Sequence, residues 1–169
     1  ANGFTDLLKQ IAEVQGIRRI RFISPHPSDF HPDIVGVIEG FPVVCNHIHL
    51  PVQSGSTKVL RRMKRDYTRE EYLQKVEFLK KSKREIALST DIIVGFPGET
   101  QEDFEETLSL IEFVGYDSMF SFKYSPRPGT EAFSFSEVIS EEEKSRRLQV
   151  LQQFQRKIQL QRHSKMVGK

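Results

Sequence analysis

The sequence alternates between short apolar runs rich in β-branched residues and longer stretches whose apolar residues recur at helical spacing. Four such runs occur, at residues 19–24, 47–52, 87–96 and 118–124. The stretch after the third run carries Phe104, Leu108 and Ile111 on one helical face. This alternation predicts βαβ units, in which parallel strands share one sheet and helices connect them. The third run has three consecutive apolar residues at 92–94, which is typical of a strand covered on both faces.

The spacing of these units predicts part of a barrel. Strand and helix recur about every 30–40 residues, as in a (β/α) barrel or a doubly wound sheet. A complete eight-unit barrel needs about 250 residues, whereas this chain has 169. We therefore expect an α/β fold of about four parallel strands with flanking helices, either a small open sheet or the C-terminal portion of a TIM-like barrel. Because the sequence begins in a helical pattern, we interpret it as cut from something longer.

A long helix is expected at the C-terminal end. Three sites carry a hydroxyl residue three positions before an acid, at residues 68–71, 100–103 and 140–143. This spacing predicts a capping box at the start of three helices. The last helix should run from about Glu141 to Arg162, after a linker at 134–140. We thus divide the chain into a partial barrel at residues 1–135 and a linker with the C-terminal helix at residues 136–169.

Composition limits the class of protein. No run of about 18 apolar residues is present, so we expect no transmembrane helix, and the first ten residues lack the pattern of a signal peptide. The single cysteine, Cys45, can form no internal disulfide, which fits a reducing compartment. One thiol also cannot hold a metal or an iron–sulfur cluster by itself. These features predict a cytoplasmic protein with no membrane partner.

Basic residues cluster although the net charge is only +2. The densest group comprises Arg61, Arg62, Lys64 and Arg65. Such a group suits contacts with phosphates. Charge alone nevertheless favours a solvated helix face, which is the common origin of such a pattern.

Polar loops rich in glycine and proline follow the expected strands. They span residues 24–27, 51–56, 94–99 and 124–130. The carboxyl ends of parallel strands form the ligand-binding face of α/β folds, so these loops predict a binding site. Gln53 and Ser54 offer an amide and a hydroxyl next to a flexible glycine. Arg127 stands between two prolines, a stiff mount for a guanidinium that binds carboxylate or phosphate.

Simpler structural roles are open for single motifs. Ser56 suits an ordinary helix cap, and residues 95–99 suit a rigid turn that leads into the next helix. His47 and His49 point to one face of a strand, as a metal pair does, but they lie at its amino end, away from the four loops. His26 is better placed, at the carboxyl end of the first expected strand.

Taken together, the motifs are recognisable as a set. They comprise residues 49–56 (HLPVQSGS), 63–65 (MKR), 67–72 (YTREEY), 89–100 (STDIIVGFPGET) and 124–130 (YSPRPGT). In this order they resemble the radical S-adenosylmethionine (SAM) methylthiotransferases, and most closely the MiaB-type enzymes that act on tRNA. The resemblance covers nearly the whole chain.

The branch of the family depends on fewer residues. Methylthiotransferases that act on a ribosomal protein tend to have Gln-His where this chain has Gln53-Ser54. A third branch, which acts on threonylcarbamoyl-adenosine in tRNA, shares the Gln-Ser-Gly-Ser string. The segment at 124–130 is more similar to the MiaB type.

The resemblance implies a larger enzyme with two 4Fe–4S clusters. One cluster would lie in an N-terminal methylthiotransferase domain, and a cysteine loop of the partial barrel would hold the second, which cleaves SAM. A small RNA-binding β domain would follow. The implied reaction adds a methylthio group to carbon 2 of an isopentenyladenosine beside the anticodon. Its partners would be a tRNA anticodon stem-loop and a reducing electron donor.

The resemblance also assigns roles to residues of this chain. It implies SAM contacts from Gln53, Ser54, Val94, Gly95, Glu99 and Tyr124. It implies substrate contacts from His26, Arg61, Arg62, Arg65 and Arg127. We expect no catalytic or metal-ligating residue here, no cluster bound by this chain, and no activity from the chain alone.

Two other classes remain open on the sequence. One is a non-catalytic α/β module whose basic helices bind RNA or protein. The other is a barrel metal hydrolase that uses His26, His47, His49 and Asp91.

Overall fold

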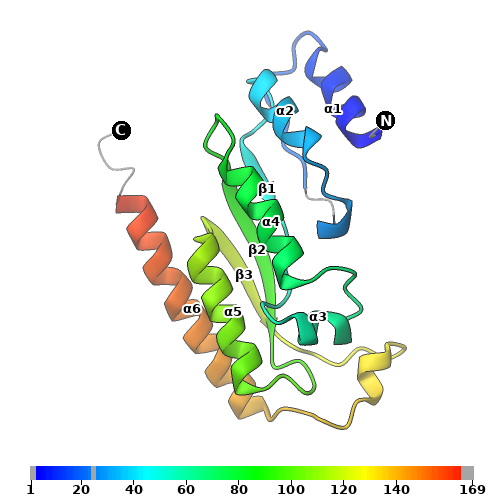
Figure 1. Ribbon diagram of the computed structural model, residues 1–169, viewed down its shortest axis with the longest axis vertical. Helices are drawn as coiled ribbons and strands as arrows, with labels where there is room; N and C mark the ends of the chain where they lie inside the picture. The colour runs from blue at the N-terminus through cyan, green and yellow to red at the C-terminus, as the bar shows by residue number, and fades with distance from the viewer. Residues whose placement is uncertain (1–2, 24–25, 165–169) are drawn as a thin grey trace.

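The computed structural model describes residues 3–23 and 26–164 of the chain. Three parallel strands form one sheet in the order β1 (His47–His49), β2 (Ala87–Val94) and β3 (Ser118–Lys123). Ile48 of β1 lies opposite Leu88 of β2. Neighbours in the sheet are also neighbours along the chain, and helices connect them, as parallel βαβ units require (Figure 1). The α/β fold and its parallel sheet are thus confirmed.

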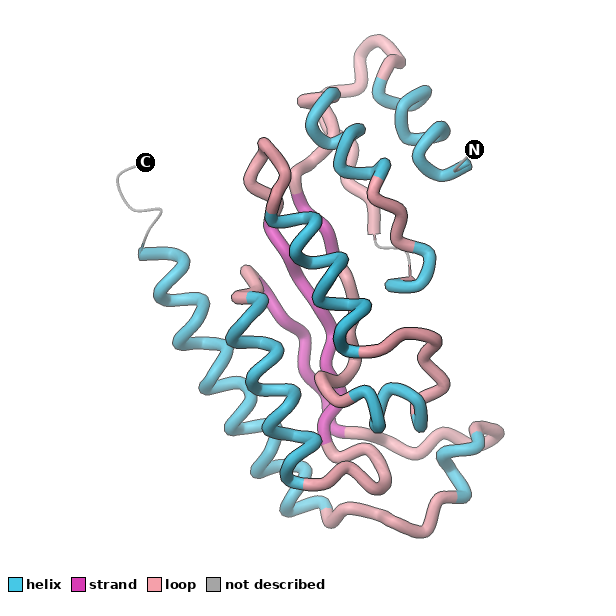
Figure 2. The backbone as a smooth tube through the Cα atoms, in the orientation of Figure 1, coloured by secondary structure: helices cyan, strands magenta, loops and turns pink. Residues whose placement is uncertain are grey.

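The described residues form six α-helices: α1 (Gly3–Ala12), α2 (Asp33–Gly40), α3 (Thr57–Arg62), α4 (Arg69–Lys80), α5 (Gln101–Val114) and α6 (Glu141–Ser164). Two short 3₁₀ turns, η1 (Pro27–Asp29) and η2 (Glu131–Ser134), lie in the loops. Helices α3 and α4 connect β1 to β2, α5 connects β2 to β3, and α6 follows β3. Helices α4 and α5 lie on the same side of the sheet, and α6 runs beside α5 (Figures 1 and 2).

The first expected strand, at 19–24, is not a strand in the structure. Ile20 makes a single parallel bridge to Val44, in which the Ile20 N–H donates to the Val43 carbonyl at 2.8 Å. The Cys45 N–H donates back to the Ile20 carbonyl at 2.9 Å. Val44 directly follows a turn and is not part of a strand. The described residues of the run at 19–23 therefore have no neighbouring strand, only this one bridge. Residue 24 lies outside the described residues.

The second expected strand is shorter than its apolar run, and proline explains the interruption. Pro51 has no N–H to donate to the ladder. The next N–H, of Val52, donates to the Thr90 side-chain oxygen at 2.9 Å instead of to a carbonyl. Pairing with β2 resumes as a parallel bridge between Gln53 and Ile92.

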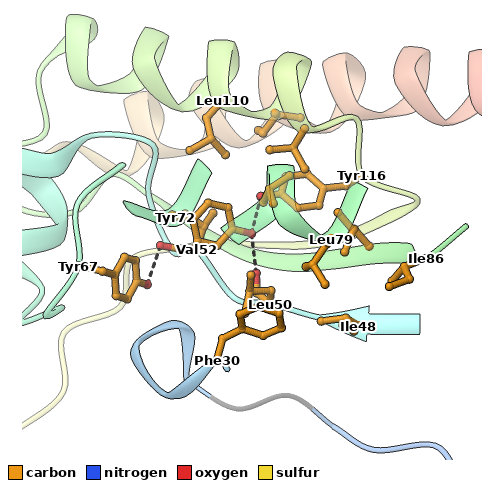
Figure 3. Packing of buried hydrophobic residues seen from close by; sticks show 14 of the residues in the cluster. Phe30, Ile48, Leu50, Val52, Tyr67, Tyr72, Leu79, Ile86, Leu110 and Tyr116 are labelled. Carbon is orange, nitrogen blue, oxygen red and sulfur yellow. Dashed lines mark hydrogen bonds between the residues drawn. The ribbon is translucent and has the colours of Figure 1, made fainter. Parts of the chain in front are cut away.

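The core lies between the sheet and helices α4 and α5. Alternate residues of β2 point into it, and Ile92 and Val94 are fully buried there. Tyr72 of α4 donates from its hydroxyl to the Leu50 carbonyl at 2.8 Å, and the Tyr116 hydroxyl lies 2.7 Å from it (Figure 3). Burial raises the pKa values of Tyr72 and Tyr116 well above the ordinary value for tyrosine, so both hydroxyls stay protonated.

The predicted capping boxes form at two of the three sites. Thr68 and Thr100 each accept from the third N–H of their helix, and the acid at that position bonds back to the cap. Ser140 accepts from the Glu143 N–H at 3.2 Å, but both carboxylate oxygens of Glu143 bond to arginines of α6. Helix α6 packs on α5 and the sheet through the fully buried Leu151. None of the helices in the described ranges has the length and apolarity needed to cross a membrane.

Candidate functional site

A cavity of about 730 Å³ opens at the carboxyl end of the sheet. Its walls come from the segments that follow all three strands and from the end of α3. The lining residues are Gln53, Arg62, Met63, Lys64, Arg65, Asp91, Ile93, Phe96, Phe122, Lys123, Tyr124, Ser125, Arg127, Thr130, Glu131 and Ala132. The structure thus brings three of the four polar loops together at one edge. The loop at 24–27 is described only in part.

Gln53 enters the cavity wall in a conformation that is uncommon for a residue with a side chain. Its φ is +69°, in the left-handed region. Hydrogen bonds hold it on both sides, because its N–H donates to the Asp91 carbonyl and its carbonyl accepts from the Ile93 N–H, both at 2.9 Å. Such conformations cost about 1–3 kcal/mol and cluster at functional sites.

Ser54, Gly55 and Ser56 face α5 rather than the cavity. Ser54 is fully buried, and its hydroxyl accepts from the Ser56 N–H at 3.2 Å. The Gly55 N–H donates to the Thr107 hydroxyl at 2.9 Å. The Ser56 hydroxyl donates to Asp103 at 2.7 Å rather than capping its own helix. These contacts fasten the loop after β1 to α5.

Asp103 is the charged centre of that attachment. Burial raises its pKa, but hydrogen bonds from Thr100, Ser56 and Lys58 outweigh that effect and hold the pKa at about 2. Asp103 is therefore a carboxylate throughout the neutral range, and it is part of the scaffold behind the cavity wall.

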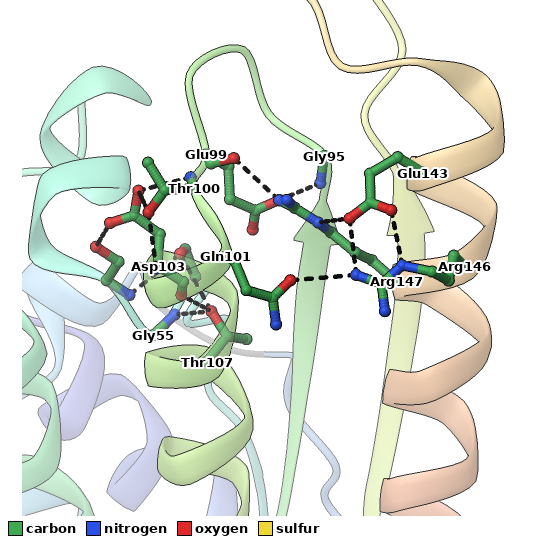
Figure 4. A network of polar contacts seen from close by, with 12 residues as sticks. Gly55, Gly95, Glu99, Thr100, Gln101, Asp103, Thr107, Glu143, Arg146 and Arg147 are labelled. Carbon is green, nitrogen blue, oxygen red and sulfur yellow. Dashed lines mark hydrogen bonds and ion pairs between the residues drawn. The ribbon is translucent and has the colours of Figure 1, made fainter.

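The loop after β2 contributes one residue, Phe96, to the cavity lining. By contrast, the Val94 side chain is fully buried in the core. The Glu99 carboxylate accepts from the Gly95 N–H and from Arg147 of α6 at 2.8 Å (Figure 4). Burial raises the pKa of Glu99, and these two donors oppose the rise. Val94, Gly95 and Glu99 thus lie behind the wall.

The segment after β3 contributes Tyr124 and Arg127 to the cavity wall. The Tyr124 ring packs edge-on against Phe96, with 5.0 Å between ring centroids. Its hydroxyl is buried and has no hydrogen-bond partner within the described part of the chain. Arg127 lines the same cavity and is an exposed residue.

The basic group at the end of α3 divides between the cavity and the surface. Arg62 forms an ion pair with Glu137, and Arg65 lies 2.9 Å from the His26 imidazole. Arg62 and Arg65 both line the cavity. His26 lies beside Arg65, not in the wall, and Arg61 is exposed outside it.

The cavity includes residues to which the resemblance assigned no contact with SAM or substrate. Asp91 and Ile93 line it from β2, and Phe122 lines it from β3. Strand alternation in the sequence could have identified them. Alternate residues of β2 point into the core, so the residues between them must face the other side of the sheet. Phe122 is about half exposed there.

The histidines form a polar chain on that same side of the sheet. The Asp91 carboxylate lies 3.4 Å from His49, and the Ser89 hydroxyl lies 3.0 Å from both His49 and His47. His26 is engaged with Arg65 instead. Within residues 3–23 and 26–164, no three His, Cys, Asp or Glu side chains lie close enough to hold a metal ion.

The cavity is cationic with an apolar floor. Five basic side chains line it, from Arg62, Lys64, Arg65, Lys123 and Arg127, against two acids. Aromatic and aliphatic surface comes from Ile93, Phe96, Phe122 and Tyr124. This combination suits a ligand that joins an anionic group to a planar or apolar one.

The sequence and the fold agree with a known superfamily. Residues 2–111 match the Radical SAM superfamily, so the chain belongs to it. The structure also resembles that of coproporphyrinogen III oxidase from Escherichia coli, described as a Radical SAM enzyme. Their TM-score is 0.71 at 19% identity, over 94% of this chain and 37% of that one. The expected portion of a radical SAM barrel is thereby confirmed.

Particular relatives agree with the resemblance seen in the motifs. The chain is 53% identical over 166 residues to the tRNA-2-methylthio-N(6)-dimethylallyladenosine synthase of Koribacter versatilis. It is 54% identical over 165 residues to the protein of that name from Solibacter usitatus. Each comparison covers 98% of this chain but only 37% of the relative, so the chain spans little more than a third of their length.

Proposed function

We propose that the chain supplies part of the SAM and substrate site of a tRNA methylthiotransferase, which adds a methylthio group to carbon 2 of an isopentenyladenosine beside the anticodon. The observation that carries this proposal is identity above 50% to relatives of that name along 98% of the chain. The cavity supports it, because its residues fit a charged nucleoside ligand.

Residues of the cavity suit the hydroxyl, ammonium and adenine groups of SAM. When bound, SAM supplies the radical chemistry. The Gln53 amide and the Asp91 carboxylate suit its hydroxyl and ammonium groups. Phe96 offers a surface to the adenine, and the unpartnered Tyr124 hydroxyl offers a hydrogen bond. Ser54, Val94, Gly95 and Glu99 would contribute by holding these segments in place.

The iron–sulfur chemistry must come from residues outside this sequence. A 4Fe–4S cluster is held by several thiolates, and the chain has one cysteine. Cys45 is half-buried, and its thiol accepts from the Arg19 guanidinium at 3.0 Å. We therefore place both clusters of the intact enzyme elsewhere and expect the 169-residue chain to be inactive alone.

Basic groups at the cavity mouth suit the tRNA. Arg127 and the group at the end of α3, Arg61, Arg62 and Arg65, would contact the anticodon stem-loop, with His26 positioning Arg65. The reaction also requires a reducing electron donor. As a tRNA-modifying enzyme, the intact protein would act in the cytoplasm.

The test uses the full-length protein, purified without oxygen and reconstituted with iron and sulfide. Incubation with SAM, a reductant and isopentenylated tRNA should produce a methylthio-nucleoside, detected by mass spectrometry of the digested tRNA. Product formed only with threonylcarbamoylated tRNA, or only with a ribosomal protein, would move the enzyme to another branch. A protein that binds tRNA but neither binds nor cleaves SAM would be a non-catalytic module.

Variants of the cavity wall test the SAM assignment. Gln53→Ala and Asp91→Asn should each raise the dissociation constant for SAM about tenfold, because the first removes a hydrogen-bonding amide and the second removes the negative charge that faces the ammonium group. The exposed Gln153→Ala of α6 serves as the control and should bind SAM like the parent protein. Unchanged SAM affinity in both cavity variants would contradict this placement of the ligand.

A further inference from the structure

We infer that Arg147 of α6 is a positioning residue for the loop at 95–99, and that it sets the affinity for SAM from behind the cavity wall. This inference rests on the proposed function, since it assumes that the cavity binds SAM. It extends the site to a helix that contributes no residue to the cavity lining.

The first support is the contact itself. Arg147 Nη1 donates to the Glu99 carboxylate at 2.8 Å and to the Glu99 backbone carbonyl at 3.0 Å. The Glu99 side chain is completely buried, and only 7% of the Arg147 side chain is exposed. A buried pair of this kind depends on both partners, because removing one leaves the other charged and unpaired.

The second support is the close packing of α6 on Gly95. A Cβ placed on Gly95 would fall 2.4 Å from the Lys144 side chain, and Gly95 has φ of +73°. Lys144 is 3% exposed, and its ammonium group lies 5.8 Å from the centre of the Tyr124 ring. Helix α6 therefore touches the loop at its first residue through Lys144 and at its last residue through Arg147.

The third support is the position of Phe96 between those two contacts. Gly95 and Glu99 are joined by the hydrogen bond from the Gly95 N–H to the Glu99 carboxylate, so the loop closes on itself. Phe96 lies within it and faces the cavity together with Tyr124. Because α6 holds both ends of the loop at 95–99, Phe96 has a fixed position on the cavity side of that loop.

Helix α6 offers a matched control one residue away. Arg146 shares the partner Glu143 with Arg147, at 2.7 Å from Arg146 and 2.8 Å from Arg147. Its outer nitrogen donates to the Gln101 side chain rather than to Glu99, and half of its side chain is exposed. Removing Arg146 deletes a charge and a Glu143 contact without touching the loop.

The experiment compares SAM and tRNA binding in the full-length reconstituted protein at a temperature well below unfolding. Arg147→Ala should raise the dissociation constant for SAM about tenfold and leave that for tRNA unchanged. Arg147→Lys keeps the charge and should recover part of the loss. Arg146→Ala should bind both ligands like the parent protein. If Arg147→Ala does not fold, Glu99→Gln, which keeps the shape of the side chain, is measured in its place and should show the same selective loss.

Other outcomes are distinguishable. Equal SAM affinity in the parent and Arg147→Ala proteins would overturn the positioning role and leave the proposed function intact. Parallel losses of SAM and tRNA binding, or a loss of SAM binding in Arg146→Ala as large as in Arg147→Ala, would overturn it as well. A parent protein that does not bind SAM would instead overturn the proposed function.

Discussion

Gly55 lies so close to α5 that a Cβ placed on it would fall 2.4 Å from the Thr107 Cα. The same two residues are joined by the hydrogen bond from the Gly55 N–H to the Thr107 hydroxyl at 2.9 Å. The loop after β1 is thus fastened to the helix after β2, two positions after Gln53. Placement of Gln53 in the cavity wall depends on this contact between distant segments.

Gly55→Ala should destabilise the fold, because the added methyl group meets the helix backbone, which cannot yield as a flexible side chain does. We expect a loss of about 1–3 kcal/mol in the free energy of unfolding, measured by urea denaturation. Gly36→Ala is the matched control, since Gly36 lies within α2 with nothing near its Cβ position. It should be neutral or stabilise by about 0.5–1 kcal/mol. Equal effects of the two variants would contradict the close approach.

The buried tyrosine pair predicts an asymmetry between two similar variants. Because Tyr72 donates to the Leu50 carbonyl, its oxygen accepts from the Tyr116 hydroxyl. Tyr72→Phe leaves the Tyr116 hydroxyl buried without that acceptor, whereas the Leu50 carbonyl still accepts from Thr90. We expect Tyr72→Phe to cost about 1–3 kcal/mol and Tyr116→Phe about 1 kcal/mol, by urea unfolding. A larger cost for Tyr116→Phe would reverse the assigned direction of the bond.

Asp103 predicts a loss of stability in acid. Its pKa of about 2 in the folded chain lies below the ordinary value of 3.8, so the unfolded chain binds the proton first. The stabilisation is complete above about pH 5 and declines as the pH falls toward 2, by about 2 kcal/mol in total. In Asp103→Asn this part of the decline should disappear from unfolding curves measured between pH 7 and 2.5. The exposed Glu112→Gln should decline like the parent chain, and an unchanged decline in Asp103→Asn would refute the assignment.

Two arginines at the end of α3 are expected to differ in their contribution to tRNA binding. Arg61 is exposed, whereas Arg62 is ion-paired with Glu137 and lies 4.8 Å from the centre of the Phe135 ring. Arg61→Gln should lower the slope of log K for tRNA against log salt by about one, as expected for one lost phosphate contact. Lys9→Gln, exposed on α1, should leave the slope unchanged. A slope unaffected by Arg61→Gln would remove this residue from the tRNA surface.

Local chemistry explains which parts of the fold were predictable. The capping boxes at Thr68 and Thr100 use atoms within four residues of each other, so the sequence specifies them almost completely. The run at 19–24 has the composition of a strand, but a strand needs a partner, and only Val44 pairs with Ile20 in the described residues. Composition alone cannot supply that partner.

The candidate site shows the same limit at two adjacent positions. Gln53 and Ser54 belong to one motif, yet Gln53 lines the cavity and Ser54 is buried against α5. The left-handed φ of Gln53 and the packing of Gly55 determine which side chain faces which way. Asp91, considered from the sequence only as a metal ligand, lines the cavity because β2 alternates its faces.

The sequence by itself determined the alternation of strands and helices, the helix starts, the long C-terminal helix and the resemblance to radical SAM methylthiotransferases. These features depend on periodicity, short-range hydrogen bonds and sequence motifs, all of which involve residues close to one another along the chain. Only the tertiary structure decided which residues of each loop face the cavity and which face a helix. That choice depends on contacts across long separations, such as the buried pair of Glu99 and Arg147, 48 positions apart. Such a pair forms only where the fold buries both side chains together, and burial is a property of the assembled fold.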